Sequence, residues 1–298
     1  MHMTPIWCLN RRDYQGRILF RPPRVVYVLI VAFLVFVVVL YVGMRIQQAE
    51  VDRAPSTIDL FTTSKVCGMI ILVNETKISS VAVSKSHNNS QETGGFVSAS
   101  TFDDVDSLWS HADELKSSGV EVDDAVVANC GTCGQCSNPH DVGIYDDTKN
   151  TLTGDAKRCA YRALIGGRGP STDCMRKNVG FTDSCNECWV DNIMCDMKKC
   201  AFVCMWNEIF GRQFGHTSGG KEILNPCKTC DEKRCGRAFT NCAGANRRRS
   251  GIISDIARDD KNELCTVADD GWWLRDDLAM DWESGNWRMS RNSGSGGA

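Results

Sequence analysis

Three cysteines at intervals of three, Cys130-Gly-Thr-Cys133-Gly-Gln-Cys136, come closest in this sequence to a reactive chemical site. They follow the apolar run Ala125–Ala128. A Cys-x-x-Cys pair between a strand and a helix suits thiol–disulfide exchange, because the helix N-terminus lowers the pKa of the thiol. Here Ser137–Asp141 has the composition of a turn rather than of that helix. We therefore expect structural disulfides, with a secretory-pathway thiol–disulfide oxidoreductase using the redox pair Cys130 and Cys133 as the alternative.

The other cysteines favour the structural interpretation. Of the 17 cysteines, 15 lie between Cys130 and Cys265, a density typical of a disulfide scaffold. Cys8 stands apart near the N-terminus, and the remaining 16 form an even number that allows eight disulfides, although spacing alone cannot choose their pairing. The cysteines expected in disulfides are Cys67, Cys130, Cys133, Cys136, Cys159, Cys174, Cys185, Cys188, Cys195, Cys200, Cys204, Cys227, Cys230, Cys235, Cys242 and Cys265.

Other chemistries find little support in the sequence. Between Cys133 and Cys185, which begins the next separate Cys-x-x-Cys pair, lie 51 residues, whereas a zinc ribbon places its second pair about 15–20 residues on. Asp104-Val105-Asp106 resembles the metal-binding Asp-x-Asp of Golgi glycosyltransferases, but it falls on the exposed face of an expected helix, and the β/α alternation of a nucleotide-sugar site is missing. The sequence also lacks a nucleophile elbow, a phosphate loop and an HExxH motif. We expect no catalytic residue, no metal and no cofactor, and favour a protein that is not an enzyme.

An uncharged apolar run of 20 residues, Val25–Met44, predicts a membrane-spanning helix. As a helix it would be about 30 Å long, the thickness of the hydrocarbon core of a bilayer. A secretory signal peptide has a shorter apolar core. The flank with the excess of positive charge stays in the cytoplasm. The N-terminal flank contains one acidic residue, Asp13, and five arginines: Arg11, Arg12, Arg17, Arg21 and Arg24. The run is therefore expected to be a signal anchor of a single-pass type II membrane protein.

This orientation places the cysteines in the lumen of the endomembrane system or outside the cell, where disulfides persist. The N-glycosylation motifs at Asn74 and Asn88 lie on the same side. Residues 46–298 hold 28 basic and 36 acidic residues, and a net charge of −8 argues against nucleic acid as a partner. The expected partners are the membrane and a protein or small ligand of the luminal domain, which makes this domain a non-catalytic binding or structural module.

The fold class that follows is a membrane-anchored chain with one transmembrane helix and a cysteine-rich, mostly α luminal domain stapled by disulfides, preceded by a small α/β lobe. The expected organisation is a cytoplasmic tail (1–24), a transmembrane signal anchor (25–44), a stem (45–66), the α/β lobe (67–128), the cysteine-rich helical domain (129–266) and a tryptophan-rich acidic tail with a disordered end (267–298). Hydrophobic periodicity predicts strands at 69–73, 81–83 and 122–127, and helices at 102–115, 155–165, 184–210, 227–242 and 252–264.

The helix expected from Ser184 is the most informative of these elements. Ser184 and Glu187 have capping-box spacing, and no glycine or proline interrupts the chain before Gly211. At 100° per residue, Cys188 and Cys195 lie about 20° apart, whereas Cys204 lies about 160° from Cys188. We therefore expect this helix to be central and pinned by disulfides on both sides.

Overall fold

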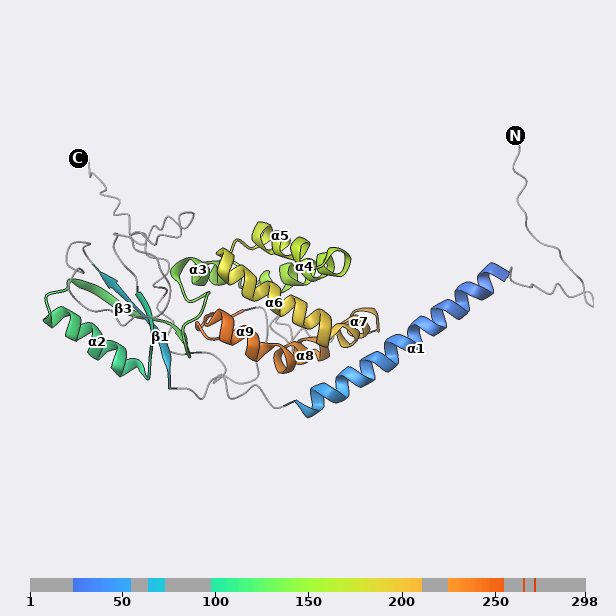
Figure 1. Cartoon of the computed structure of the whole chain (residues 1–298), viewed down its shortest axis with the longest axis horizontal. Helices are drawn as coiled ribbons and strands as arrows, with labels where there is room; N and C mark the ends of the chain where they lie inside the picture. The colour runs from blue at the N-terminus through green and yellow to red at the C-terminus, as the bar shows by residue number, and fades with distance from the viewer. Residues whose placement is uncertain are drawn as a thin grey trace, which may run out of the picture.

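The computed structural model describes residues 24–54, 64–72, 98–210 and 225–254, together with Cys265 and Gly271. Figure 1 shows the sheet at one end of the molecule, the helical domain in the middle and helix α1 projecting from the other end. The strand expected at 81–83, the acceptors Asn74 and Asn88, and nearly all of the expected cytoplasmic tail, the 252–264 helix and the tryptophan-rich tail lie outside the described residues.

Helix α1 spans Arg24–Arg53. It is long and apolar enough to cross a membrane. Most of its apolar side chains are exposed, with Val25 at 67% and Leu29 at 63%, whereas the core helix of a soluble protein would bury such residues. The helix continues to Arg53, so the first nine residues of the expected stem are helical.

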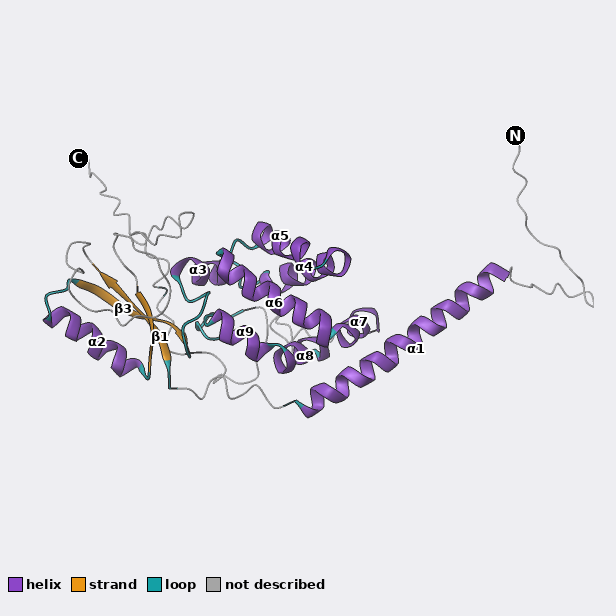
Figure 2. Ribbon diagram, viewed as in Figure 1, coloured by secondary structure: helices purple, strands orange, loops and turns teal. Residues whose placement is uncertain are grey.

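A small antiparallel sheet with one covering helix precedes the helical domain (Figure 2), as the sequence predicts. Its elements are β1 (Val66–Leu72), β2 (Ser98–Phe102), α2 (Val105–Ser117) and β3 (Val122–Cys130), with the strand order β2-β1-β3. Gly68 of β1 pairs with Ser100 on one side and Val127 on the other. Leu108 and Ala112 of α2 are buried in the core with these strands. Asp104 caps α2 by accepting a hydrogen bond from the backbone N–H of Ser107, which gives this Asp-x-Asp motif a structural role.

The domain that follows is built from short helices around α6 (Figure 1). Its helices are α3 (Pro139–Asp147), α4 (Leu152–Gly166), α5 (Arg168–Asn178), α6 (Asp183–Lys199), α7 (Ala201–Phe210), α8 (Pro226–Arg234) and α9 (Gly236–Ala243). Helix α6 contacts α4 and α5 on one side and α8 and α9 on another, which makes it central as expected.

Three helix predictions differ from the structure. The helix expected at 227–242 is two helices, because α8 ends at Arg234 and α9 begins at Gly236. The stretch from Ser137 is a helix start rather than a turn, because Asn138 accepts a hydrogen bond from the N–H of Asp141 and Pro139 occupies the first helical turn, where its missing N–H costs nothing. The single helix expected at 184–210 is two helices. Cys200 leaves the helical conformation and is bonded to Cys230, so α7 takes a new direction without any glycine or proline. The cap of α6 is Thr182 rather than Ser184.

Eight disulfides connect the described residues, in agreement with the predicted disulfide scaffold. The pairs are Cys67–Cys133, Cys130–Cys265, Cys136–Cys185, Cys159–Cys174, Cys188–Cys242, Cys195–Cys235, Cys200–Cys230 and Cys204–Cys227. Helix α6 is joined to the segment before α3 through Cys185, and to the α8–α9 side through Cys188 and Cys195. Cys188 and Cys204 bridge to different neighbours as predicted, to Cys242 of α9 and to Cys227 of α8, although Cys204 lies in α7 and not in the same helix as Cys188.

Candidate ligand-binding groove

A groove of about 1440 Å³ lies between α4, α6, α7, α8, α9 and residues 246–254. Its walls combine side chains from five helices that are up to about a hundred residues apart in the sequence. The apolar lining residues include Ala156, Ala160, Tyr161, Leu164, Trp189, Ile193, Met197, Met205, Ile209, Phe239 and Ile252. A concave, mostly apolar space of this kind is the usual form of a binding site for a small molecule or an apolar segment.

Disulfides fix the walls of this groove relative to one another. Cys188–Cys242 joins α6 to α9, and Cys204–Cys227 joins α7 to α8. Cys204 and Cys227 themselves line the groove. Covalent links between its walls keep the space open without a ligand, which lowers the ordering cost of binding.

An aromatic cluster forms one part of the wall. The indole N–H of Trp189 donates a 2.9 Å hydrogen bond to the hydroxyl of Tyr145, which is fully buried. Burial raises the pKa of Tyr145 above its ordinary value, so this hydroxyl stays neutral. Phe239 packs edge-on against Trp189 with ring centroids 4.7 Å apart, and Phe181 stacks on it from another side. Trp189 is therefore held in a single orientation in the groove wall.

Two acidic residues lie at the base of the groove, where α6 meets α8. Asp231 accepts a hydrogen bond of 2.9 Å from Asn192. Burial, and then the charge and the hydrogen bond of Asp231, raise the pKa of Asp196 to about 9. Asp196 is therefore a neutral carboxylic acid at neutral pH, and this end of the groove carries less negative charge than its sequence indicates.

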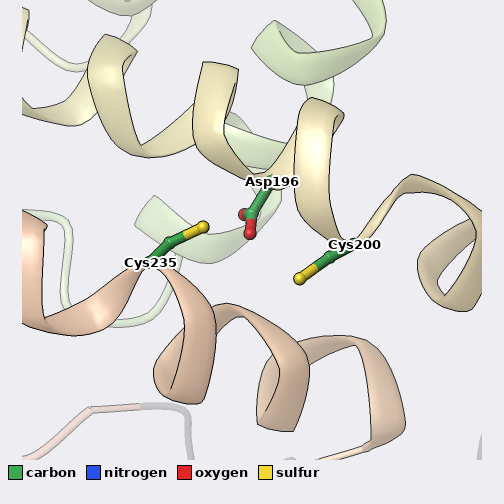
Figure 3. A group of neighbouring side chains, drawn as sticks. All are labelled: Asp196, Cys200 and Cys235. Carbon is green, nitrogen blue, oxygen red and sulfur yellow. The ribbon is translucent and has the colours of Figure 1, made fainter. Parts of the chain in front are cut away.

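Figure 3 shows the carboxyl group of Asp196 between the sulfurs of Cys200 and Cys235. The ligand atoms of these three residues lie within 4.8 Å of one another, the compactness of a metal site. Both sulfurs, however, belong to disulfides, to Cys230 and Cys195 respectively, and a disulfide sulfur is not the thiolate that binds zinc. The arrangement is therefore a packed junction of two disulfides rather than a set of metal ligands.

The arginine run at 247–249 supplies basic groups to the opposite wall. Arg247 donates to the carbonyl oxygen of Lys149 at 2.8 Å and to the hydroxyl of Thr153 at 3.1 Å. Arg249 is 5% exposed, and burial lowers the pKa of its guanidinium. Its Nη1 donates to the carbonyl oxygens of Thr240 and Gly244 at 3.5 and 3.4 Å, whereas its Nε has no hydrogen-bond partner in the part of the chain that the structure describes. The groove thus combines an apolar lining with a buried cation.

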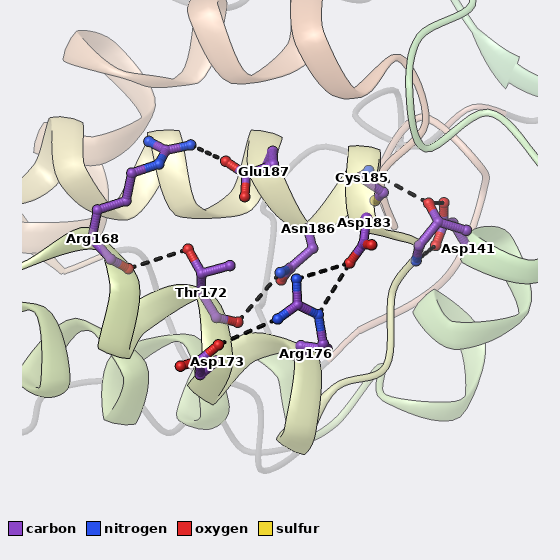
Figure 4. A network of polar contacts seen from close by, with 10 residues as sticks. Asp141, Arg168, Thr172, Asp173, Arg176, Asp183, Cys185, Asn186 and Glu187 are labelled. Carbon is purple, nitrogen blue, oxygen red and sulfur yellow. Dashed lines mark hydrogen bonds and ion pairs between the residues drawn. The ribbon is translucent and has the colours of Figure 1, made fainter. Parts of the chain in front are cut away.

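A second polar network ties α5 to α6 (Figure 4). Arg176 binds Asp183 at 3.0 Å, and the side chain of Asn186 donates to the carbonyl oxygen of Thr172 at 3.3 Å. Arg168 also pairs with Glu187. Since its ion pairs are exposed and individually weak, we assign this network to the alignment of the two helices rather than to a site.

The predicted redox cysteines are separated by their bonds. Cys130 is joined to Cys265 and Cys133 to Cys67, so within the described residues the two sulfurs do not form a disulfide with each other. Both lie between the sheet and the helical domain, outside the groove.

The groove itself was not predicted. Trp189, Met205 and Phe239 have the spacing of ordinary core residues, and their convergence depends on disulfide pairing that the sequence does not reveal.

Residues 169–267 match the model of a protein family described as a family of unknown function (DUF8771). The matched stretch runs from the start of α5 to just beyond Cys265 and contains α6 to α9, which form most of the groove. Comparisons with curated proteins and with solved structures give no significant match. The chain thus contains a disulfide-rich helical domain whose function has to be argued from its geometry.

Proposed function

We propose that this chain is a single-pass type II membrane protein whose luminal or extracellular domain binds an elongated apolar ligand in the groove, without catalysing a reaction. The observation that carries the proposal is the groove itself, about 1440 Å³ of largely apolar space between helices held by disulfides. Its volume exceeds the roughly 300–1,000 Å³ of a drug-sized pocket, which favours a long ligand such as an acyl chain.

The anchoring part of the proposal rests on α1. Its apolar side chains are exposed along the run 25–44, and a bilayer is the solvent that would cover them. The arginines that precede the run favour a cytoplasmic N-terminus. The eight disulfides agree with this orientation, because the domain that contains them then folds in an oxidising compartment.

The binding part rests on the composition of the groove. With Asp196 neutral and Arg249 buried without an acidic partner among the described residues, the lining favours a ligand that is apolar along its length and neutral or anionic at one end. The acidic excess of residues 46–298 disfavours nucleic acid. Cys130 and Cys133, bonded to distant cysteines, lack the shared disulfide on which the oxidoreductase alternative depends.

A photoreactive fatty acid tests this proposal on the full-length chain in phosphatidylcholine nanodiscs. After irradiation, peptide mapping should find adducts on the groove segments of α4 and α6 in addition to α1, which contacts lipid and acts as an internal control. Ala160→Trp fills the groove, whereas the control variant Ile165→Trp places the same side chain on α4 at a position that is 92% exposed.

We expect Ala160→Trp to reduce the groove adducts at least tenfold, while adducts on α1 and the adducts of Ile165→Trp stay unchanged. Gly154→Trp offers a second filled groove, since a Cβ at this position meets no atom within 4 Å and the fold should tolerate it. Groove adducts that are absent from the natural chain, or that persist in both filled variants, would overturn the proposal.

A further inference from the structure

Helix α7 packs against the last turns of the apolar run of α1. Tyr41 and Trp206 have ring centroids 5.3 Å apart, and the ring of Phe202 lies over Gly43. Going from Phe202 to Trp206 along α7 therefore corresponds to going backwards along α1, so the two helices are antiparallel. Figure 1 shows α7 beside the C-terminal half of α1.

Polar contacts fix this packing in position. The side-chain oxygen of Gln47 accepts hydrogen bonds from the backbone N–H groups of Phe202 and Val203, at 2.9 and 3.1 Å. Glu50 forms an ion pair of 2.8 Å with Arg234 at the end of α8. Helix α1 is therefore connected to two helices of the domain, and the expected stem is not a free spacer along these residues.

The buried positions of α1 form one stripe along the helix. Val37, Leu40, Met44, Gln47 and Val51 are buried or half-buried, at alternating intervals of three and four residues. This is the spacing of a helix that packs along its length against a neighbour. The stripe begins inside the apolar run 25–44, so the domain covers α1 on part of the segment that would lie in the bilayer.

Helix α7 carries apolar side chains that the described protein leaves exposed. Phe210 is 43% and Ile209 is 50% exposed, and the ring of Phe210 lies 4.5 Å from that of Trp206, one turn farther along. Ten residues of α7 contain a single ionisable side chain, Glu208, which pairs with Lys157 of α4 at 2.7 Å. The exposed part of α7 is thus suited to a solvent less polar than water.

We propose that α7 lies in the headgroup interface of the membrane, with Trp206 and Phe210 in contact with lipid. This inference rests on the proposed spanning of the bilayer by α1. Along the helix axis, Tyr41 is about 4.5 Å before Met44, the last residue of the apolar run. Because the ring of Trp206 packs against that of Tyr41, Trp206 lies near the end of the apolar run and hence at the interface. Aromatic residues with a polar atom are enriched at this depth. Phe210, one turn beyond Trp206, reaches towards the acyl chains.

This placement joins the groove to the bilayer. Met205 and Ile209 of α7 line the groove, while Phe202 and Trp206 of the same helix contact α1. Helix α7 is therefore the wall between the groove and the lipid, and an apolar ligand would have to travel only across one helix to move from the membrane into the domain.

Site-specific photocrosslinking in phosphatidylcholine liposomes tests the inference on the full-length chain. A photoreactive phenylalanine analogue replaces Phe210, or Phe33 in the middle of α1, or Ile165 on α4, and lipid adducts are quantified by mass spectrometry. Phe33 is 61% and Ile165 is 92% exposed, so all three positions tolerate the analogue. Thermal unfolding confirms the fold of each variant, and Trp206, which does not line the groove, provides a second position on α7.

We expect lipid adducts at Phe33 and Phe210, with at least tenfold less at Ile165. Adducts at Phe33 without adducts at Phe210 or Trp206 would overturn the interfacial position of α7 and leave the anchor intact. If lipid adducts are absent at Phe33 as well, the proposal that α1 spans the membrane is wrong. Equal labelling at Ile165 and Phe210 would also contradict the inference, because the whole domain would then contact lipid without preference for α7.

Discussion

The carboxyl group of Asp196 in α6 lies beside that of Asp231 in α8, where the two helices meet. The pKa of Asp196 rises to about 9, first because the group is buried and then because Asp231 is close to it, so Asp196 keeps its proton at neutral pH. Asn192 donates a hydrogen bond of 2.9 Å to Asp231. The junction between α6 and α8 therefore contains a titratable pair beside the disulfide from Cys195 to Cys235.

This pair predicts that the protein becomes less stable as the pH rises. The folded chain keeps the proton of Asp196 up to about pH 9, whereas the unfolded chain loses it near pH 4. The folded state then binds more protons between these values, and the free energy of unfolding falls with pH by at most about 1.4 kcal/mol per unit. Urea unfolding at pH 5 and at pH 8.5 measures the difference.

The substitution Asp196→Asn isolates the contribution of this carboxyl group. An amide keeps the shape of the carboxyl group but has no acidic proton to lose, so we expect the variant to gain stability over the natural chain at pH 8.5 and little at pH 5. Asp183→Asn is the matched control, since the side chain of Asp183 is 81% exposed and pairs only at the surface with Arg176. An equal pH dependence in Asp196→Asn and the natural chain contradicts the assignment.

Substitution of two glycines, Gly134 and Gly154, tests how tightly the Cys130–Cys136 segment packs against its neighbours. A Cβ on Gly134 would lie 2.6 Å from the carbonyl oxygen of Cys242, and this backbone cannot retreat because it also bonds to Gln135 and Cys136. Gly134→Ala should therefore cost about 1–3 kcal/mol of stability, the usual cost of overpacking. Gly154→Ala, in open space on α4, should gain up to about 1 kcal/mol through helix propensity. Thermal unfolding of both variants is the measurement, and similar changes in the two would contradict the close approach.

The elements that could be predicted are those with strong local signals. The apolar run of α1, the helical spacing of Leu108 and Ala112 in α2, and the number of cysteines all depend on residues close together in the chain. Strand β2 was missed because its sequence, Ser98–Phe102, has little apolar character, and its partners in β1 stabilise it. Helix α5 was missed because Gly169 and Pro170 indicate a loop, although a proline is tolerated in the first turn.

The groove and the α1–α7 contact could not be predicted for a different reason. Both bring together residues that are distant in sequence, such as Trp189 with Phe239 and Gln47 with Val203. Their positions follow from the disulfide pairing and from the break at Cys200, and neither has a local signal. The arginine run illustrates the same limit, since only the fold shows that Arg249 is buried while its neighbours bond elsewhere.

Disulfide mapping distinguishes a structural scaffold from a redox site. Cys130 and Cys133 share one proteolytic peptide, so partial reduction with stepwise alkylation of the full-length chain precedes the digestion. It should assign Cys130 to Cys265 and Cys67 to Cys133, with no free thiol among these four. An oxidoreductase would instead show one pair that accepts an alkylating reagent after mild reduction while the fold persists. Recovery of a Cys130–Cys133 linkage would contradict the structure and revive the redox alternative.

The hydrogen bonds from α7 to Gln47 make a final prediction about how the domain is attached to its anchor. The first backbone N–H groups of a helix lack partners within the helix, and Gln47 supplies an acceptor for two of them from a helix more than 150 residues away in the sequence. Gln47→Leu should therefore cost about 1 kcal/mol, the typical effect of losing a helix cap. Gln47→Glu keeps an acceptor and adds a negative charge at the positive end of α7, so its stability should equal or exceed that of the natural chain.

Gln48→Leu is the matched control for this series, because among the described residues Gln48 bonds within α1, to the exposed side chain of Asp52. Hydrogen exchange at the first turn of α7 gives a local readout beside thermal unfolding. Exchange should accelerate in Gln47→Leu and stay slow in Gln47→Glu and Gln48→Leu, since only the first removes the acceptor. Equal exchange in all three variants would mean that α7 keeps its N-terminus ordered without α1, and the rigid attachment of the domain to its anchor would then depend on Glu50 and Arg234 instead.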